Sequence, residues 1–187
     1  MPIRFPIPPK VVFAVVPVAL AIPELDIPPV RQWGGEWCWA ACAEMVFGFY
    51  KRPKAQCELV KQLFNMQTCC QGHPPDKPQP GCDRACFPDQ VATLYGLGTN
   101  GLTATMETNL ITFDPVKDEI GAMQPVEVEM FLNSSRHMIL VRGAGKNPGG
   151  TEMIKYNDPW TAAAATDTFA HLQQAFAGHW WRKIRKS

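Results

Sequence analysis

Seven cysteines, all in the first half of the chain, constrain this sequence more than any other feature. Seven is many for a reduced cytosolic domain of this size, and such a set is typical of an oxidising compartment. The odd number predicts one thiol kept for chemistry and three disulfides among the rest, for which 15 pairings are possible. We therefore expect a secreted or extracytoplasmic protein. The cysteines are Cys38, Cys42, Cys57, Cys69, Cys70, Cys82 and Cys86.

The size and charge of the chain limit its architecture and its partners. With 187 residues, of which 46% are hydrophobic and 19% charged, the chain can bury one core but not two. The net charge of +1 gives no overall attraction to nucleic acid or to an anionic membrane. Four cations gather in the C-terminal tail, where we expect a solvated end. They are Arg182, Lys183, Arg185 and Lys186.

The first 29 residues are rich in proline and are expected to form either a signal-like segment or an extended arm lying on the domain. Their apolar run, Val11–Ile22, is shorter than the ~20 residues that a membrane-spanning helix needs. We therefore expect no membrane span. The remaining residues, 30–187, are expected to form a single domain.

Helical patterns come before strand patterns along the chain. Residues 38–50 contain no proline and are apolar on almost every face, which predicts a helix buried at the centre of the domain. In Val126–Leu132, Glu127 and Glu129 alternate with apolar residues, as in a half-buried strand. This order favours an α+β fold with an antiparallel sheet. Further helices are predicted at Gln56–Phe64, Asp89–Tyr95, Asp114–Ala122 and Thr168–Ala177, and further strands at Leu102–Glu107, His137–Val141 and Met153–Tyr156.

Cys38 is the candidate nucleophile because it opens the buried helix. The unpaired N–H groups and positive dipole end of a first helical turn stabilise a thiolate. Gln32 lies six residues upstream, before the Gly34-Gly35 turn, so its amide can return to the helix start. The Gln32 amide and the Cys38 N–H could then form an oxyanion hole. Considered alone, each residue also fits a purely structural role.

A candidate base and its orienting partner come from the strand region. His137 begins an apolar strand after a polar turn, and an imidazole there can face a cysteine on the helical half. Asp158 and Asn157 follow the next predicted strand, where either side chain could fix the tautomer of the ring. Asp158 is the preferred third member, and Asn157 is the alternative.

The order of these residues resembles that of papain-like cysteine proteases. Gln32, then Cys38-Trp39-Ala40-Ala41, then His137, then Asn157-Asp158 carries the resemblance, which extends over about residues 25–182. The sequence is most similar to the short bacterial branch, which includes bacteriocin-leader peptidase domains and plant-pathogen effector proteases. The resemblance implies a papain-like α+β fold and hydrolysis of a protein or peptide substrate without a cofactor. Cys38 would be the nucleophile, His137 the general base and acid, Gln32 an oxyanion donor, and Asp158 the orienting residue, because the short branch uses the Asp of an Asp-Pro pair.

Two features depart from the family pattern. Glu36-Trp37 replaces the small residues that usually precede the Cys-Trp pair. In addition, 137 − 38 = 99 residues separate cysteine from histidine, against about 130–150 in papain and cathepsins. We therefore expect shortened substrate-binding loops.

Three other interpretations remain open from the sequence. Cys69, Cys70, His73, Cys82 and Cys86 could bind zinc, although their spacing matches no common zinc motif. The same fold could instead be a non-catalytic, disulfide-rich binding module. The chain could also be a papain-like transferase or deamidase with the same triad, because proteases, transferases and deamidases of this type all form an acyl-enzyme. We expect no metal and no bound cofactor, and the sequence leaves the oligomeric state unknown.

Overall fold

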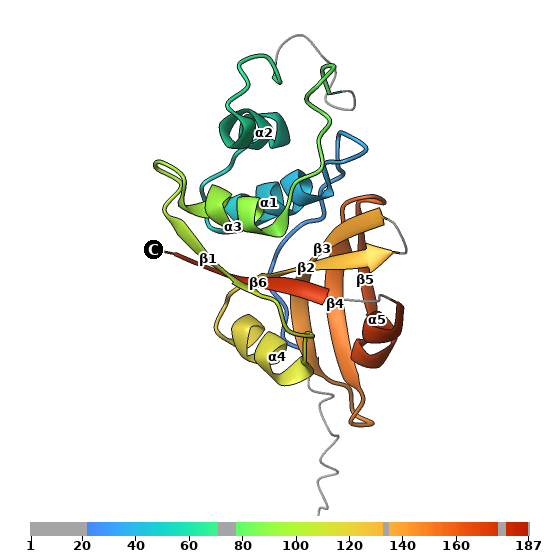
Figure 1. Ribbon diagram of the computed structural model, residues 1–187. Coiled ribbons are helices and arrows are strands. Elements are labelled where there is room, and N and C mark those ends of the chain that lie inside the picture. The colour runs from blue at the N-terminus through green and yellow to red at the C-terminus, as the bar shows by residue number, and fades with distance from the viewer. Residues whose placement is uncertain (1–21, 71–77, 133–134, 176–178, 187) are drawn as a thin grey trace, which may run out of the picture.

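A computed structural model of the chain describes residues 22–70, 78–132, 135–175 and 179–186. Figure 1 shows the first three helices gathered above an antiparallel sheet, with two later helices lower in the view. The helices are α1 (Cys38–Phe49), α2 (Gln56–Phe64), α3 (Pro88–Gly96), α4 (Phe113–Gly121) and α5 (Phe169–Ala175). The strands are β1 (Leu102–Glu107), β2 (Val126–Leu132), β3 (Ser135–Lys146), β4 (Glu152–Asp158), β5 (Ala163–Thr168) and β6 (His179–Lys186).

The sheet carries the second half of the molecule. Its strand order is β1-β6-β2-β3-β4-β5, and every neighbouring pair is antiparallel. Helix α1 packs against β3 and against α2, while α3 packs against β1. The α+β prediction is therefore confirmed, and the central helix lies between the helical half and the sheet, as expected.

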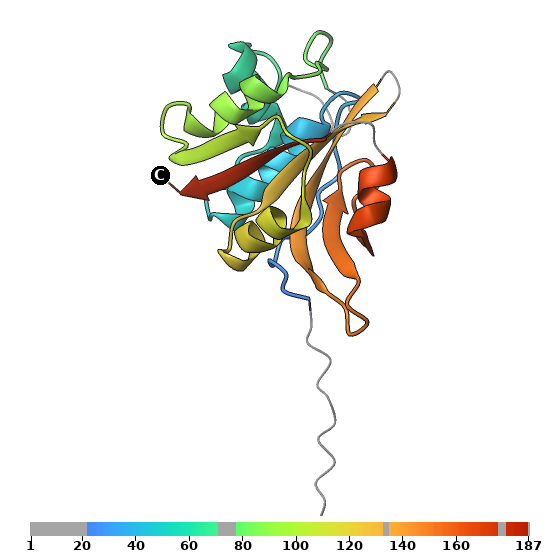
Figure 2. The ribbon, with the colours of Figure 1, turned by 60° about the horizontal axis from the view of Figure 1, so that its bottom comes forward.

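The cationic tail is not a solvated end, so that prediction was wrong. The tail forms β6, which inserts between β1 and β2 (Figure 2). Lys183 and Arg185 lie 3.3 and 3.0 Å from the buried carboxylate of Glu119 on α4. These ion pairs compensate two of the cations of a strand that lies inside the sheet. Strand β5 was also not predicted.

The proline-rich arm joins the domain before residue 30. Glu24 forms a β-bridge with Gly143, and Leu25 donates its N–H to the Arg142 carbonyl at 2.6 Å. The side chains of Leu25 and Ile27 are buried in the core. The packed unit thus begins at residue 24 or earlier, and the end of the arm lies on the domain. Residues 1–21, on which the signal-like alternative rests, lie outside the described residues.

Strand β2 is buried on both faces, although its alternating glutamates predicted one exposed face. Glu127 and Glu129 are 0% and 2% exposed. Tyr95 on α3 donates its hydroxyl to Glu127 at 2.5 Å, and Arg136 lies 3.5 Å from Glu129. A polar partner for each carboxylate compensates for its burial.

Two disulfides are present, Cys57–Cys70 and Cys69–Cys82. The prediction of three disulfides was therefore wrong, because Cys42 and Cys86 keep their thiol groups, as does Cys38. The Cys42 thiol lies 3.6 Å from the Met138 carbonyl in the buried interface of α1 and β3. Each disulfide joins residues 13 apart, and closing a loop of that size stabilises the fold by about 3 kcal/mol. Two disulfides suggest an extracytoplasmic environment.

Among the helices that the structure describes, none has the length and hydrophobicity that are needed to cross a bilayer.

Candidate active site

A cleft of about 720 Å³ lies between the start of α1, the start of β3 and the end of β4. It brings together four of the five residues expected at the site: Gln32, Cys38, His137 and Asp158. The other lining residues are Gly35, Glu36, Ala85, Ser135, Arg136 and Trp160.

The turn before α1 places Cys38 at the cleft. The carboxylate of Asp83 accepts the N–H groups of Gly35 and Glu36 at 3.1 and 2.8 Å. A Cβ at Gly34 would lie 2.5 Å from the same carboxylate, so a side chain at this position would displace Asp83 from the turn. Cys38 then occupies the first turn of the helix, whose N–H groups have no partner within the helix.

Two buried tryptophans fix the helix start to the disulfide-linked loop. The indole N–H of Trp37 donates to the Cys82 carbonyl at 2.8 Å, and that of Trp39 donates to the Arg84 carbonyl at 3.0 Å. Because Cys82 is bonded to Cys69, the loop that holds Asp83 is covalently restrained. The disulfide therefore supports the position of Cys38 as well as the loop itself.

His137 and Asp158 are in direct contact across β3 and β4. The His137 Nε2 lies 2.9 Å from the Asp158 Oδ1, and both side chains are largely buried, with 19% and 26% exposed. The Trp160 N–H donates to the same carboxylate oxygen at 2.9 Å. With Nε2 engaged by Asp158, Nδ1 is the ring nitrogen left to exchange a proton with a thiol.

Asn157 points away from the cleft. Asn157 is fully buried. Its amide Nδ2 donates to the Ile27 carbonyl at 2.8 Å and lies 3.4 Å from the Met45 sulfur. These contacts attach the N-terminal arm to the core. The geometry thus gives Asn157 a packing environment and gives Asp158 the contact with histidine.

The Gln32 side chain lines the cleft but donates to its own turn. Its Nε2 lies 2.7 Å from the Gly34 carbonyl and 3.0 Å from the Gly35 carbonyl. The backbone N–H of Gln32 donates to the Pro159 carbonyl at 2.8 Å, which joins this turn to the turn after β4. Both amide hydrogens are engaged, so an oxyanion role would require the amide to rotate.

Burial of the sulfur raises the pKa of the Cys38 thiol to about 11. Backbone N–H groups of Met138 and Trp39 oppose this increase, while the charges of Glu129 and Glu36 add to it. The sequence had predicted a lowered pKa from the helix start, and the direction is the opposite because desolvation outweighs the N–H donors. The contact with Met138, the residue after His137, also places the sulfur against the strand that carries the imidazole.

The family of the chain follows from a comparison with protein-family models. The model of the peptidase C39-like family matches residues 24–187. The chain belongs to the peptidase C39-like family. This membership confirms the resemblance to the short papain-like branch and makes the protein a papain-like cysteine protease that acts on protein substrates.

The solved structure of a bacterial peptidase domain shows the same fold as this C39-like chain. The peptidase domain of Streptococcus ComA, a bifunctional ABC transporter of a quorum-sensing pathway, matches with a TM-score of 0.60 at 12% identity, covering 86% of this chain and 99% of that domain. The proform of the ragweed pollen cysteine protease Amb a 11 matches with a TM-score of 0.49 at 15% identity, covering 86% of this chain and 56% of that one. No curated protein matched the sequence.

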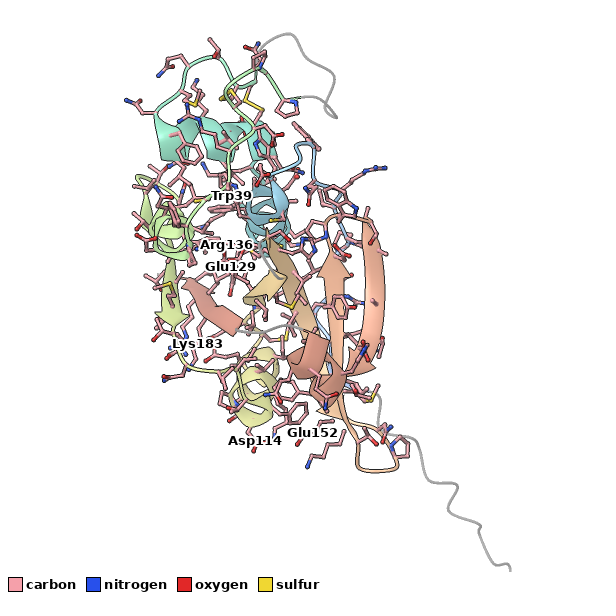
Figure 3. The ribbon with its side chains drawn as sticks, turned by 45° about the vertical axis from the view of Figure 1, so that its right-hand side comes forward. Trp39, Asp114, Glu129, Arg136, Glu152 and Lys183 are labelled. Atoms are coloured by element: carbon pink, nitrogen blue, oxygen red, sulfur yellow. A yellow bond between two sulfur atoms is a disulfide. The ribbon has the colours of Figure 1, made fainter. Side chains whose placement is uncertain are left out.

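The sequence did not point to Asp83, which holds the turn before α1, or to Arg136, which lines the cleft of this C39-like peptidase. Asp83 had no recognisable signal of its own, although the Gly34-Gly35 pair leaves room for another group to approach the backbone closely. Arg136 lies next to His137 and over the ring of Phe87, with 5.2 Å from its guanidinium carbon to the ring centroid. Figure 3 shows Arg136 and Glu129 close together at the junction of the helical half and the sheet.

Most of the residues expected as zinc ligands cannot bind a metal in this structure. Cys69, Cys70 and Cys82 are disulfide-bonded and cannot supply thiolates to a metal. His73 lies outside the described residues. Within the part of the chain that the structure describes, no cluster of three or more metal-binding side chains was found.

Proposed function

We propose that the protein hydrolyses peptide bonds through a Cys38-His137-Asp158 triad and an acyl-enzyme intermediate. The observation that carries this proposal is the 2.9 Å contact between His137 Nε2 and Asp158 Oδ1 in the cleft that Cys38 lines. The contact orients the imidazole and stabilises its protonated form, as the third member of a triad does.

The proposed reaction begins with transfer of the Cys38 thiol proton to His137 Nδ1. The sulfur attacks the carbonyl carbon of the peptide bond, and the negative charge develops on the carbonyl oxygen. The N–H groups at the start of α1 stabilise that oxygen, together with the Gln32 amide once it has rotated. His137 then protonates the leaving amine, the C–N bond breaks, and an acyl thioester remains on Cys38.

Hydrolysis of the thioester completes the cycle. Water gives a proton to His137 Nδ1 and attacks the acyl carbon, and the released Cys38 sulfur recovers the proton from the imidazolium. The carboxylic acid product then leaves. All the groups that this cycle needs belong to the chain itself, and none of the steps requires a cofactor.

A peptide-library assay tests this proposal. The wild type should cleave a subset of peptides, and Cys38→Ala and His137→Ala should lose that cleavage while keeping the thermal unfolding transition. Full cleavage by either variant would contradict the triad. Added amine nucleophiles distinguish a peptidase from a transferase, because a transferase would give mainly the amide product.

We also propose that the protein acts outside the cytoplasm, as a secreted protein of bacterial origin. The two disulfides support the compartment, and the resemblance to the short bacterial branch supports the origin. The protein is treated with an alkylating reagent as it is harvested from its native compartment, and its intact mass is measured. Four cysteines, those of the two disulfides, should stay unmodified. A chain whose cysteines are all reduced in that compartment would contradict the proposal.

A further inference from the structure

A second hollow, of about 350 Å³, adjoins the cleft. Gln32, Gly35 and Trp160 line both spaces, so the hollow continues the cleft past the His137–Asp158 pair. The residues that line only the hollow are Arg31, Trp33 and Gly34.

The walls of the hollow are held by buried polar contacts. Gln56 on α2 is fully buried, accepts the Trp33 N–H at 2.9 Å and donates to the Arg31 carbonyl at 2.8 Å. The Gln32 N–H donates to the Pro159 carbonyl at 2.8 Å, which fixes the turn carrying Trp160 against the same segment. The backbone on both sides of the hollow is therefore anchored before any ligand arrives.

The side chains around the hollow are aromatic and cationic. Trp160 is 61% exposed, which is unusual for a residue of this size. Trp33 is partly buried, and its ring lies 6.5 Å from the ring of buried Trp37. Arg31 is exposed and is the one ionisable residue among those that line the hollow. Among the described residues, no carboxylate forms an ion pair with Arg31.

The position of the hollow identifies the part of a substrate that it would face. In the proposed reaction the leaving amine receives its proton from His137, so the chain beyond the cleaved bond lies beside that ring. Asp158 contacts His137 on one side and accepts the Trp160 N–H on the other. A peptide that continues past His137 therefore reaches Trp160 and then the hollow.

We propose that this hollow binds the leaving-group side of the substrate, with an apolar residue packed on Trp33 and Trp160 and a carboxylate paired with Arg31. The carboxylate comes either from an acidic side chain or from a free C-terminus close to the cleaved bond. Arginine suits this role because its planar guanidinium can bind a carboxylate through two parallel hydrogen bonds. The inference rests on the proposed function, since it takes the direction of the substrate from the proposed roles of Cys38 and His137.

The test compares matched peptides that differ only after the cleaved bond. One set carries Glu or Gln two residues after the bond, and a second set ends there as a free acid or as an amide. We expect the wild type to favour the carboxylate in at least one set by about 5- to 10-fold in kcat/KM, as expected for a single, partly exposed charged contact. The set that shows the preference identifies the source of the carboxylate.

Variants assign the preference to Arg31. In Arg31→Gln the ratio between carboxylate and neutral peptides should fall to about one. Lys61→Gln removes an exposed cation on α2 that does not line the hollow or the cleft, and it should keep the wild-type ratio. A wild type that does not discriminate in either set, or an Arg31→Gln variant that keeps the ratio, would overturn the proposal.

A binding measurement separates this inference from the proposed function. Calorimetric titration of Cys38→Ala with the leaving-group peptide alone needs no turnover. Tighter binding of the carboxylate form, lost in Cys38→Ala/Arg31→Gln, would support the hollow even if the wild type cleaved none of the peptides. Equal binding of both forms by a protease that is otherwise active would leave the proposed function intact and refute the role of Arg31.

Discussion

Replacing His137 with alanine should slow the reaction of the Cys38 thiol with a disulfide reagent at neutral pH. Burial of the sulfur, backbone N–H groups and the charges of Glu129 and Glu36 act on the Cys38 thiol in the folded chain. They raise the pKa of Cys38 to about 11. Because the thiolate is lost as the pH falls below the pKa, only about one sulfur in 10⁴ would be ionised at pH 7.

The magnitude follows from the difference between that pKa and an ordinary one. Transfer of the thiol proton to His137 is a second route to the thiolate. If the resulting ion pair is populated as much as the thiolate of a free thiol with a pKa of ~8.5, the thiolate fraction at pH 7 rises about 300-fold. A less basic thiolate is also a weaker nucleophile, and a Brønsted coefficient of about 0.4–0.5 takes back roughly 10- to 20-fold. The wild type should therefore react about 20- to 30-fold faster than His137→Ala at pH 7.

The assay is the release of thiopyridone from 2,2′-dithiodipyridine between pH 5 and 10. Cys38→Ala supplies the control, because it reports the background reaction of the buried Cys42 and Cys86 thiols. The rate for His137→Ala, after subtraction, should rise about tenfold per pH unit across the whole range, whereas the wild type should level off earlier. Equal rates for the wild type and His137→Ala at pH 7 would refute the coupling of His137 to Cys38.

Three further predictions concern the oxyanion hole, the third triad member and a disulfide. Gln32→Ala should lower kcat by about 10²-fold with little change in KM, and a change in KM alone would mean that Gln32 only binds substrate. Asp158→Ala should reduce kcat/KM more than Asp158→Asn, and the assignment fails if Asp158→Ala is harmless while Asn157→Ala is severe. Replacing Cys69 and Cys82 with serine should lower the unfolding free energy by about 3 kcal/mol in urea titrations without reductant, and an unchanged midpoint would contradict a structural role for that disulfide.

The sequence was most informative where local pattern and tertiary environment agree. Strands Leu102–Glu107 and Val126–Leu132 and helix Gln56–Phe64 were predicted with the bounds that the structure has. In strand Leu102–Glu107 and helix Gln56–Phe64, the spacing of apolar residues also matches the face that is buried. The order of cysteine, histidine and aspartate also led to the family, because nucleophile and base must come from separate halves of such a fold.

The failures arose where a partner distant in sequence decides the outcome. Nothing near the tail shows that Glu119 will receive Lys183 and Arg185 and so allow a cationic strand inside the sheet. Glu129 looked solvent-exposed because Arg136 is not visible as its partner from alternation alone. The disulfide pattern could not be deduced either, since pairing depends on which cysteines the folded loops bring together.

The same reasoning explains the misjudged environment of Cys38. A helix start lowers the pKa of a thiol when water still reaches the sulfur. Here the residue lies against β3 and beside Trp39, and the loss of solvation acts more strongly than the N–H groups. The sequence identifies the helix start but gives no measure of this burial.

Intact mass spectrometry during turnover tests directly whether Cys38 carries the acyl group of the substrate. A rapidly cleaved ester or peptide substrate is mixed with the enzyme, the reaction is quenched with acid, and the protein is weighed and mapped. We predict a mass increase equal to the acyl portion of the substrate, located on Cys38 and absent from Cys38→Ala. Continued turnover by Cys38→Ala, or an acyl group mapped to another residue, would contradict it.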